Sequence, residues 1–100
     1  MDLEPLTAAR FSAHRGTNFS VMGPGGNSVE LRLTAVEGLP RQSGAPRSEP
    51  FSLIFAGPRS PLLAQRTYRL VHTALGELEI FLVPIGYDSE GGLLYEAVFN

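Results

Sequence analysis

The chain of 100 residues contains no cysteine, no tryptophan and no lysine. The lack of cysteine excludes disulfide bridges and thiolate metal sites, which often stabilise small folds. The lack of lysine leaves eight arginines and two histidines as the basic side chains, and the arginines are spread along the sequence without a cluster. Because the net charge is −2, the sequence shows no basic patch of the kind that binds nucleic acid.

Long apolar runs are missing as well. No stretch approaches the roughly 18 consecutive apolar residues of a membrane-spanning helix. The first ten residues carry two acidic side chains and lack the apolar centre of a signal peptide. Apolar residues nevertheless make up 43% of the chain, which is enough for one packed core. We therefore expect a soluble, self-contained single β domain over residues 1–100.

Apolar and polar residues alternate with a period of two in several runs, which is the pattern of half-buried β-strands. The run from Ile80 to Val83 is apolar on both faces, so we expect a central strand there or one covered by the N-terminal turn. About six strands result, and they predict an all-β fold, a small antiparallel barrel or a sandwich. The core-facing residues are expected to be Val29, Leu31, Leu33 and Ala35, then Phe51, Leu53 and Phe55, then Tyr68, Leu70 and His72, and finally Tyr95, Ala97 and Phe99.

The connections differ in composition. Residues 1–11 predict a short helical turn, from Glu4 to Phe11, that covers an open end of the barrel. Residues 38–49 are rich in Pro, Gly and Ser and predict a mobile loop. The glycines of residues 23–28 indicate a hairpin turn, and the adjacent Leu62 and Leu63 are expected to fold back and pack.

His72 is the first candidate for chemistry, because a buried imidazole needs a hydrogen-bond partner. Gln65 or Glu96 is expected to be that partner. A catalytic arrangement of Ser52, His72 and Glu96 lacks the exposed turn that carries a nucleophilic serine, so we interpret His72 as structural. The set predicted to be structural is Phe51, Phe55, Gln65, Tyr68, His72, Phe81, Glu96 and Phe99.

The last run is apolar on both faces, since Leu94 and Val98 alternate with the core-facing residues. Either this strand is interior or one of its faces meets a partner. Leu94, Val98 and Asn100 are therefore the candidates for contact with another protein.

Four segments resemble a family of small bacterial proteins classed as a domain of unknown function. They are EPFSLIFAGP at 49–58, LAQRTY at 63–68, IFLVPIG at 80–86 and YEAVFN at 95–100, and the likeness covers residues 11–100. The resemblance implies no activity. It does imply a tail-fibre or surface-assembly setting, because relatives lie beside genes for phage-tail-collar-like fibre proteins.

We therefore expect a non-enzymatic structural or assembly component that acts through contact with another protein or with itself. No cofactor, metal, nucleic acid or membrane is expected, and a tail-fibre-like protein is the expected kind of partner. The alternative is a binding module, which takes a peptide strand at an exposed sheet edge or a small apolar molecule in the barrel mouth.

Overall fold

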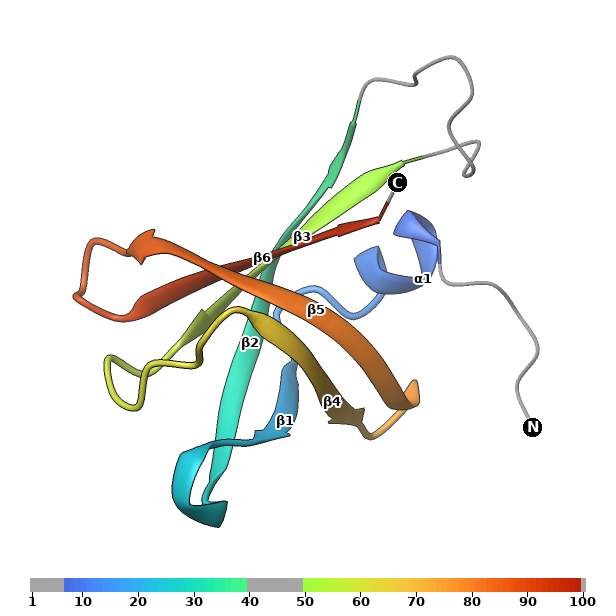
Figure 1. The fold of residues 1–100 in the computed structure, drawn as a ribbon. Coiled ribbons are helices and arrows are strands. Elements are labelled where there is room, and N and C mark those ends of the chain that lie inside the picture. Colours follow the sequence, from blue (N-terminus) through green and yellow to red (C-terminus); the bar gives the residue numbers. More distant parts are fainter. Residues whose placement is uncertain (1–6, 40–49, 100) are drawn as a thin grey trace.

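Six antiparallel strands close into a barrel in the order β1-β2-β3-β6-β5-β4 (Figure 1). The structure, a computed structural model, describes residues 7–39 and 50–99. Because both edges of the sheet pair with each other, the fold is a barrel rather than a sandwich, and the expected all-β class is confirmed. The elements are α1 Ala8–Ser12, β1 Asn18–Met22, η1 Pro24–Gly26, β2 Ser28–Gly38, β3 Phe51–Gly57, β4 Arg66–His72, β5 Gly76–Tyr87 and β6 Leu93–Phe99.

The core lies inside the barrel and confirms most of the predicted alternation. Tyr68 and Phe99 are only partly buried, and Phe99 stacks on Phe51 with ring centroids 4.7 Å apart. The residues predicted to face the core and found buried are Val29, Leu31, Leu33, Phe51, Leu53, Phe55, Leu70, His72, Tyr95 and Ala97.

Three predicted positions are wrong. Ala35 faces outward, because the ladder between β2 and β3 shifts register at Thr34 and reverses the alternation beyond it. Phe81 is 49% exposed, since the barrel packs only the inner face of β5, where Ile80 and Leu82 lie. Gln65, predicted to be structural as a possible partner of His72, is exposed in the connection that precedes β4.

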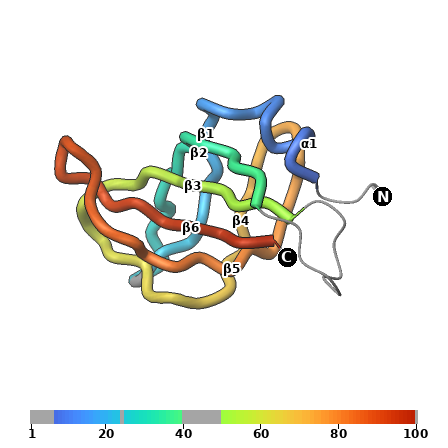
Figure 2. Tube along the Cα trace, turned by 90° about the horizontal axis from the view of Figure 1, so that it is seen from above, coloured from blue at the N-terminus to red at the C-terminus, as the bar shows by residue number. Residues whose placement is uncertain are grey.

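A short helix closes one end of the barrel, as expected. It spans Ala8–Ser12, and the Thr7 side chain caps it by accepting a hydrogen bond from the Arg10 amide at 3.2 Å. Phe11 projects from α1 into the barrel, and its ring lies 5.9 Å from that of Phe51 and 5.7 Å from that of Phe99. Both views place α1 at the same end as the last residues of β6 (Figures 1 and 2).

The opposite end is filled by Leu63, which is fully buried, while its neighbour Leu62 is exposed. The expected packing is therefore confirmed for Leu63 and wrong for Leu62. The Leu63 amide donates a buried hydrogen bond to the Tyr95 hydroxyl at 3.0 Å. That bond ties the connection between β3 and β4 to the barrel interior.

The loop predicted over residues 38–49 begins later than expected. Gly38 is the last residue of β2, and the Leu39 amide donates to the Pro50 carbonyl at 2.9 Å. The rest of that segment, residues 40–49, and residues 1–6 of the predicted helical turn lie outside the described residues. The predicted hairpin turn is confirmed, since Gly25 and Gly26 have φ values of 78° and 82°. Within residues 7–39 and 50–99, no helix is long and apolar enough to cross a membrane.

Candidate binding surface

His72 is held by three hydrogen bonds at the barrel end that α1 covers. Its Nδ1 accepts from the Ala74 amide at 3.0 Å and from the Leu75 amide at 3.1 Å. Its Nε2 lies 2.9 Å from the Thr17 hydroxyl. Since Nδ1 accepts twice, the network assigns the ring proton to Nε2, which donates to Thr17. His72 is therefore fully engaged in the neutral form.

Burial lowers the pKa of His72, because the charged imidazolium loses its hydration, and the nearby His14 lowers this pKa further. The two imidazole rings are 4.7 Å apart, edge to face. His72 thus bonds the backbone of the turn between β4 and β5, and it links this turn to Thr17, the residue before β1. Its structural role is consistent with this geometry, but the predicted partners, Gln65 and Glu96, are wrong. Glu96 lies on the outer side of β6, whereas His72 points inward.

The hypothetical catalytic set of Ser52, His72 and Glu96 does not come together. Ser52 lies between two core residues of β3, so its side chain is on the outer side of the barrel, directly opposite Val98 of β6. Its hydroxyl is buried and has no hydrogen-bond partner among the residues that the structure describes. The nucleophile and the base of that arrangement are therefore on opposite sides of the barrel wall.

Apolar side chains gather on the outer side of three neighbouring strands. The register pairs Ile54 of β3 with Glu96 of β6, and Glu96 in turn with Val83 of β5. On the next row of the same side, Ala56 pairs with Leu94. We call this surface the outer face; it comprises Ile54 and Ala56 of β3, Leu94, Glu96 and Val98 of β6, and Val83 and Ile85 of β5.

Two of the predicted contact residues, Leu94 and Val98, are on the outer face, and the third, Asn100, lies outside the described residues. Val98 and Ile85 are each 48% exposed. Glu96 is the ionisable residue of this surface and is half-buried among apolar neighbours. Within residues 7–39 and 50–99, its carboxylate makes no hydrogen bond or ion pair.

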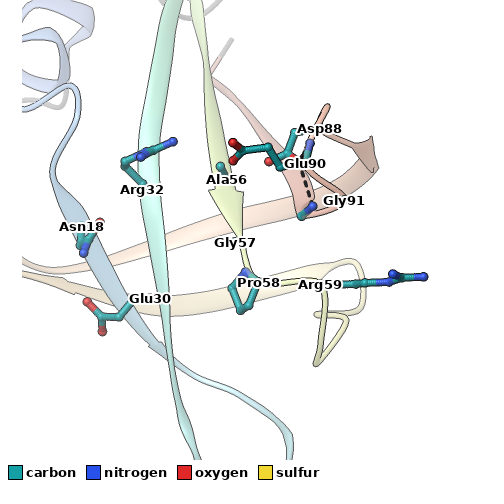
Figure 3. Close-up of a pocket in the computed structure, with 11 residues that line it drawn as sticks. Asn18, Glu30, Arg32, Ala56, Gly57, Pro58, Arg59, Asp88, Glu90 and Gly91 are labelled. Atoms are coloured by element: carbon teal, nitrogen blue, oxygen red, sulfur yellow. Dashed lines mark hydrogen bonds between the residues drawn. The ribbon is translucent and has the colours of Figure 1, made fainter.

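The outer face continues at Ala56 into a polar groove of about 470 Å³ (Figure 3). Two of its carboxylates are engaged: Asp88 accepts from the amides of Glu90 and Gly92 at 2.8 Å, and Glu30 accepts from the Ser20 hydroxyl. The lining residues are Asn18, Glu30, Arg32, Ala56, Gly57, Pro58, Arg59, Asp88, Glu90, Gly91 and Gly92.

Arg32 and Arg59 are the cationic side chains of this groove, and both are exposed. Neither forms an ion pair with a residue in the described part of the chain. Figure 3 shows Arg32 directed across Ala56 toward the hairpin loop that carries Glu90, and Arg59 directed away from the barrel. The groove therefore borders the apolar surface with charges that solvent or a partner can reach.

The alternation that points Phe51, Leu53 and Phe55 to the core puts Ile54 and Ala56 on the opposite side of β3, but it does not connect them with Leu94 and Val98. The connection depends on β3 and β6 being neighbours, and 35 residues, 58–92, separate the end of β3 from the start of β6 in the chain. The two arginines of the groove were missed for the same reason, since they come from different strands and loops.

No group of three or more His, Asp or Glu side chains within residues 7–39 and 50–99 is placed to hold a metal ion. The loop at Asp88, where two carboxylates are close in sequence, uses Asp88 for its own amides.

Comparison with known proteins gives a family match over residues 6–99, and the description of that family reads "Domain of unknown function (DUF6916)". No curated protein and no solved structure matches the chain.

Proposed function

Since the chain belongs to the DUF6916 family, whose description assigns no activity, we propose a function from its surface: the barrel is a non-enzymatic protein–protein contact module of a larger assembly. The outer face is the contact surface. The tail-fibre or surface-assembly setting that the family resemblance implies supports this role and makes a fibre-like protein the kind of partner we propose.

The observation that carries the proposal is the arrangement of apolar and charged residues on one side of the barrel. Protein interfaces have an apolar centre with a polar rim, and arginine is enriched in them. The outer face supplies the centre with Ile54, Leu94 and Val98, and the groove at Ala56 supplies the rim with Arg32 and Arg59. A soluble barrel has no need for so many apolar side chains on its outer side.

The charged residues of this surface indicate which charges the partner carries. Glu96 lies at the centre of the outer face without a cation from the described residues, so an arginine or lysine of the partner fits opposite it. Arg32 and Arg59 at the rim favour carboxylates on the partner's edge. An uncompensated carboxylate that becomes buried is costly, and this cost selects against partners that lack the matching cation.

Two further observations support a contact role over the other functions considered. Ser52, His72 and Glu96 are apart, and His72 is committed to Thr17 and two backbone amides, which speaks against hydrolysis. Phe11 and Leu63 fill the two ends of the barrel, which speaks against a small apolar ligand in its mouth.

The test is Val98→Glu, with Val71→Glu as the matched control. Val98 and Val71 are 48% and 46% exposed, but Val71 lies on β4, away from the outer face. We expect both variants to keep the far-ultraviolet circular dichroism spectrum and melting temperature of the native protein. Only Val98→Glu should lose self-association in light scattering after size-exclusion chromatography, or lose the partner recovered by affinity purification from the native host.

Two results would contradict the proposal. Unfolding of Val98→Glu alone would make Val98 a core residue, and the outer face would then not be a free surface. Equal association of both variants and the native protein would place the contact elsewhere on the barrel.

A further inference from the structure

One edge of β4 is open over most of its length. All seven residues of β4 pair with β5, but only Leu70 and Val71 pair with β1 on the other side. Residues 66–69 therefore have no ladder partner on that edge among the described strands. Unpaired backbone N–H and C=O groups on such an edge are a template for another strand.

The chain leaves the edge of β4 after β1, because the next backbone groups form the turn between β1 and β2. β1 ends at Met22, and the Gly23 amide donates to the Asn27 carbonyl at 2.7 Å. The Gly26 amide then donates back to the Gly23 carbonyl at 3.2 Å. These groups close the hairpin between β1 and β2, so they do not continue the ladder along β4.

A groove of about 400 Å³ lies along the open edge. Its apolar lining includes Met22 and Leu62, which are 63% and 57% exposed, and the backbone of residues 66–69 forms its other side. Leu62 belongs to the connection whose next residue, Leu63, is buried in the core, so its position is fixed by that anchor. The groove thus combines free backbone groups with two apolar contacts, as sites for added strands do.

The charge of the groove is positive. Arg66 stacks over Tyr68, with its guanidinium carbon 5.5 Å from the ring centroid, and the Tyr68 hydroxyl donates to the Ala64 carbonyl at 2.7 Å. No carboxylate within residues 7–39 and 50–99 pairs with Arg66. Arg69 is within 3.9 Å of Glu77, but both side chains are about two-thirds exposed, so this pair is weak and exchangeable.

From this geometry we propose that the open edge of β4 binds an extended peptide strand of a partner protein, with alternating apolar and acidic side chains. The peptide runs antiparallel to β4, in line with β1, and pairs with residues 66–69. Its carboxylates meet Arg66, on the face of β4 that carries Tyr68, and its apolar side chains contact Met22 and Leu62. This site is separate from the outer face and does not depend on it.

The test uses a fluorescein-labelled peptide of nine residues in which valine and glutamate alternate, with binding followed by fluorescence polarisation. The control peptide carries proline at its central position, because proline cannot donate to a ladder. We expect the proline peptide to bind at least about tenfold more weakly than the parent, as the loss of ladder hydrogen bonds requires. Bound parent peptide should also slow amide hydrogen exchange at residues 66–69.

Variants of the protein locate the site. Leu62→Asp should weaken binding at least about tenfold by removing an apolar contact and adding a like charge. Arg66→Gln should weaken it several-fold and reduce its salt dependence. Tyr87→Asp, which places the same charge at an exposed position on β5, should bind as the native protein does.

The proposal is overturned if the parent peptide does not bind at about 1 mM, if the proline peptide binds equally well, or if Leu62→Asp leaves the affinity unchanged. None of these results bears on the outer face, which Val98→Glu tests separately. Loss of partner contact in Val98→Glu with no peptide binding would therefore leave the proposed function standing and remove only this site.

Discussion

His72 is a buried group whose hydrogen bonds require one protonation state. Protonation at Nδ1 would break the bonds from the Ala74 and Leu75 amides. Burial also lowers the pKa of His72, so it favours the same neutral form of the ring. The unfolded chain therefore takes up this proton first as the pH falls below the ordinary value of 6.5. The stabilisation is complete above that pH and decreases as the pH falls toward the lower pKa of the folded state.

We expect the free energy of unfolding, measured in urea between pH 8 and pH 5, to fall as the pH is lowered through this window. The matched control is His72→Asn, which keeps an acceptor for the two amides and cannot titrate. Its stability should be lower at pH 8 but flatter with pH. An equally steep decline in His72→Asn would assign the acid sensitivity to other groups.

Removing the side chain altogether leaves donors unpaired. In His72→Ala the amides of Ala74 and Leu75 lose their acceptor and a small cavity remains, while the Thr17 hydroxyl loses the bond from Nε2 but keeps its bond to the His14 carbonyl. We expect a loss of about 1 to 3 kcal/mol in the free energy of unfolding at pH 8. Thr17→Val, which removes the bond to His72 and the bond to the His14 carbonyl, should cost about 1 to 2 kcal/mol. An unchanged melting temperature for His72→Ala would contradict the structural role.

Helix α1 has five residues, which is too short for intrinsic stability in water. Its position depends on Phe11, which is fully buried and contacts the rings of Phe19, Phe51 and Phe99. The helix is therefore held in place by the packing of Phe11 in the barrel core and is not an independent element.

We expect Phe11→Ala to lower the free energy of unfolding by about 3 to 5 kcal/mol, because it opens a cavity at the end of the barrel. Thr7→Ala, which removes only the cap of the same helix, should cost about 1 kcal/mol. Urea denaturation of both variants measures the difference. Equal losses would mean that α1 stabilises the barrel through its backbone and not through the Phe11 ring.

The whole barrel closes through its shortest ladder. β1 and β4 share two register pairs, whereas β3 and β6 share seven, from Phe51↔Phe99 to Gly57↔Leu93. Closure at this seam rests on Val21 and Leu70, whose side chains are buried in the common core. A barrel with one short ladder opens there at lower free energy than elsewhere.

Native-state hydrogen exchange should therefore show faster exchange for the amides at the β1–β4 seam than for those between β3 and β6. The seam opens locally, while the long ladder is lost only when the molecule unfolds globally. Equal protection at both places would show that the seam and the rest of the barrel open as one unit.

Much of the fold was predictable, because strand formation and side-chain alternation are local properties. The inward positions of Phe51, Leu53 and Phe55 follow from the period of two, and the glycines at 25 and 26 identify their turn. The same local pattern placed Ile54 on the outer side of β3 and Leu94 and Val98 on the outer side of β6. The sequence by itself thus determined the class of fold, most of the core and the outer positions of Leu94 and Val98.

The tertiary structure decided what depends on residues far apart in the chain. Which strands are neighbours is set by barrel closure, and this brings Ile54 beside Glu96 and leaves one edge of β4 open. The Thr17 hydroxyl that His72 bonds is 55 residues away, and no local pattern indicates that contact. Phe81 is exposed because a closed barrel has only one interior, so an apolar residue on the outer side of β5 cannot be buried by the fold itself.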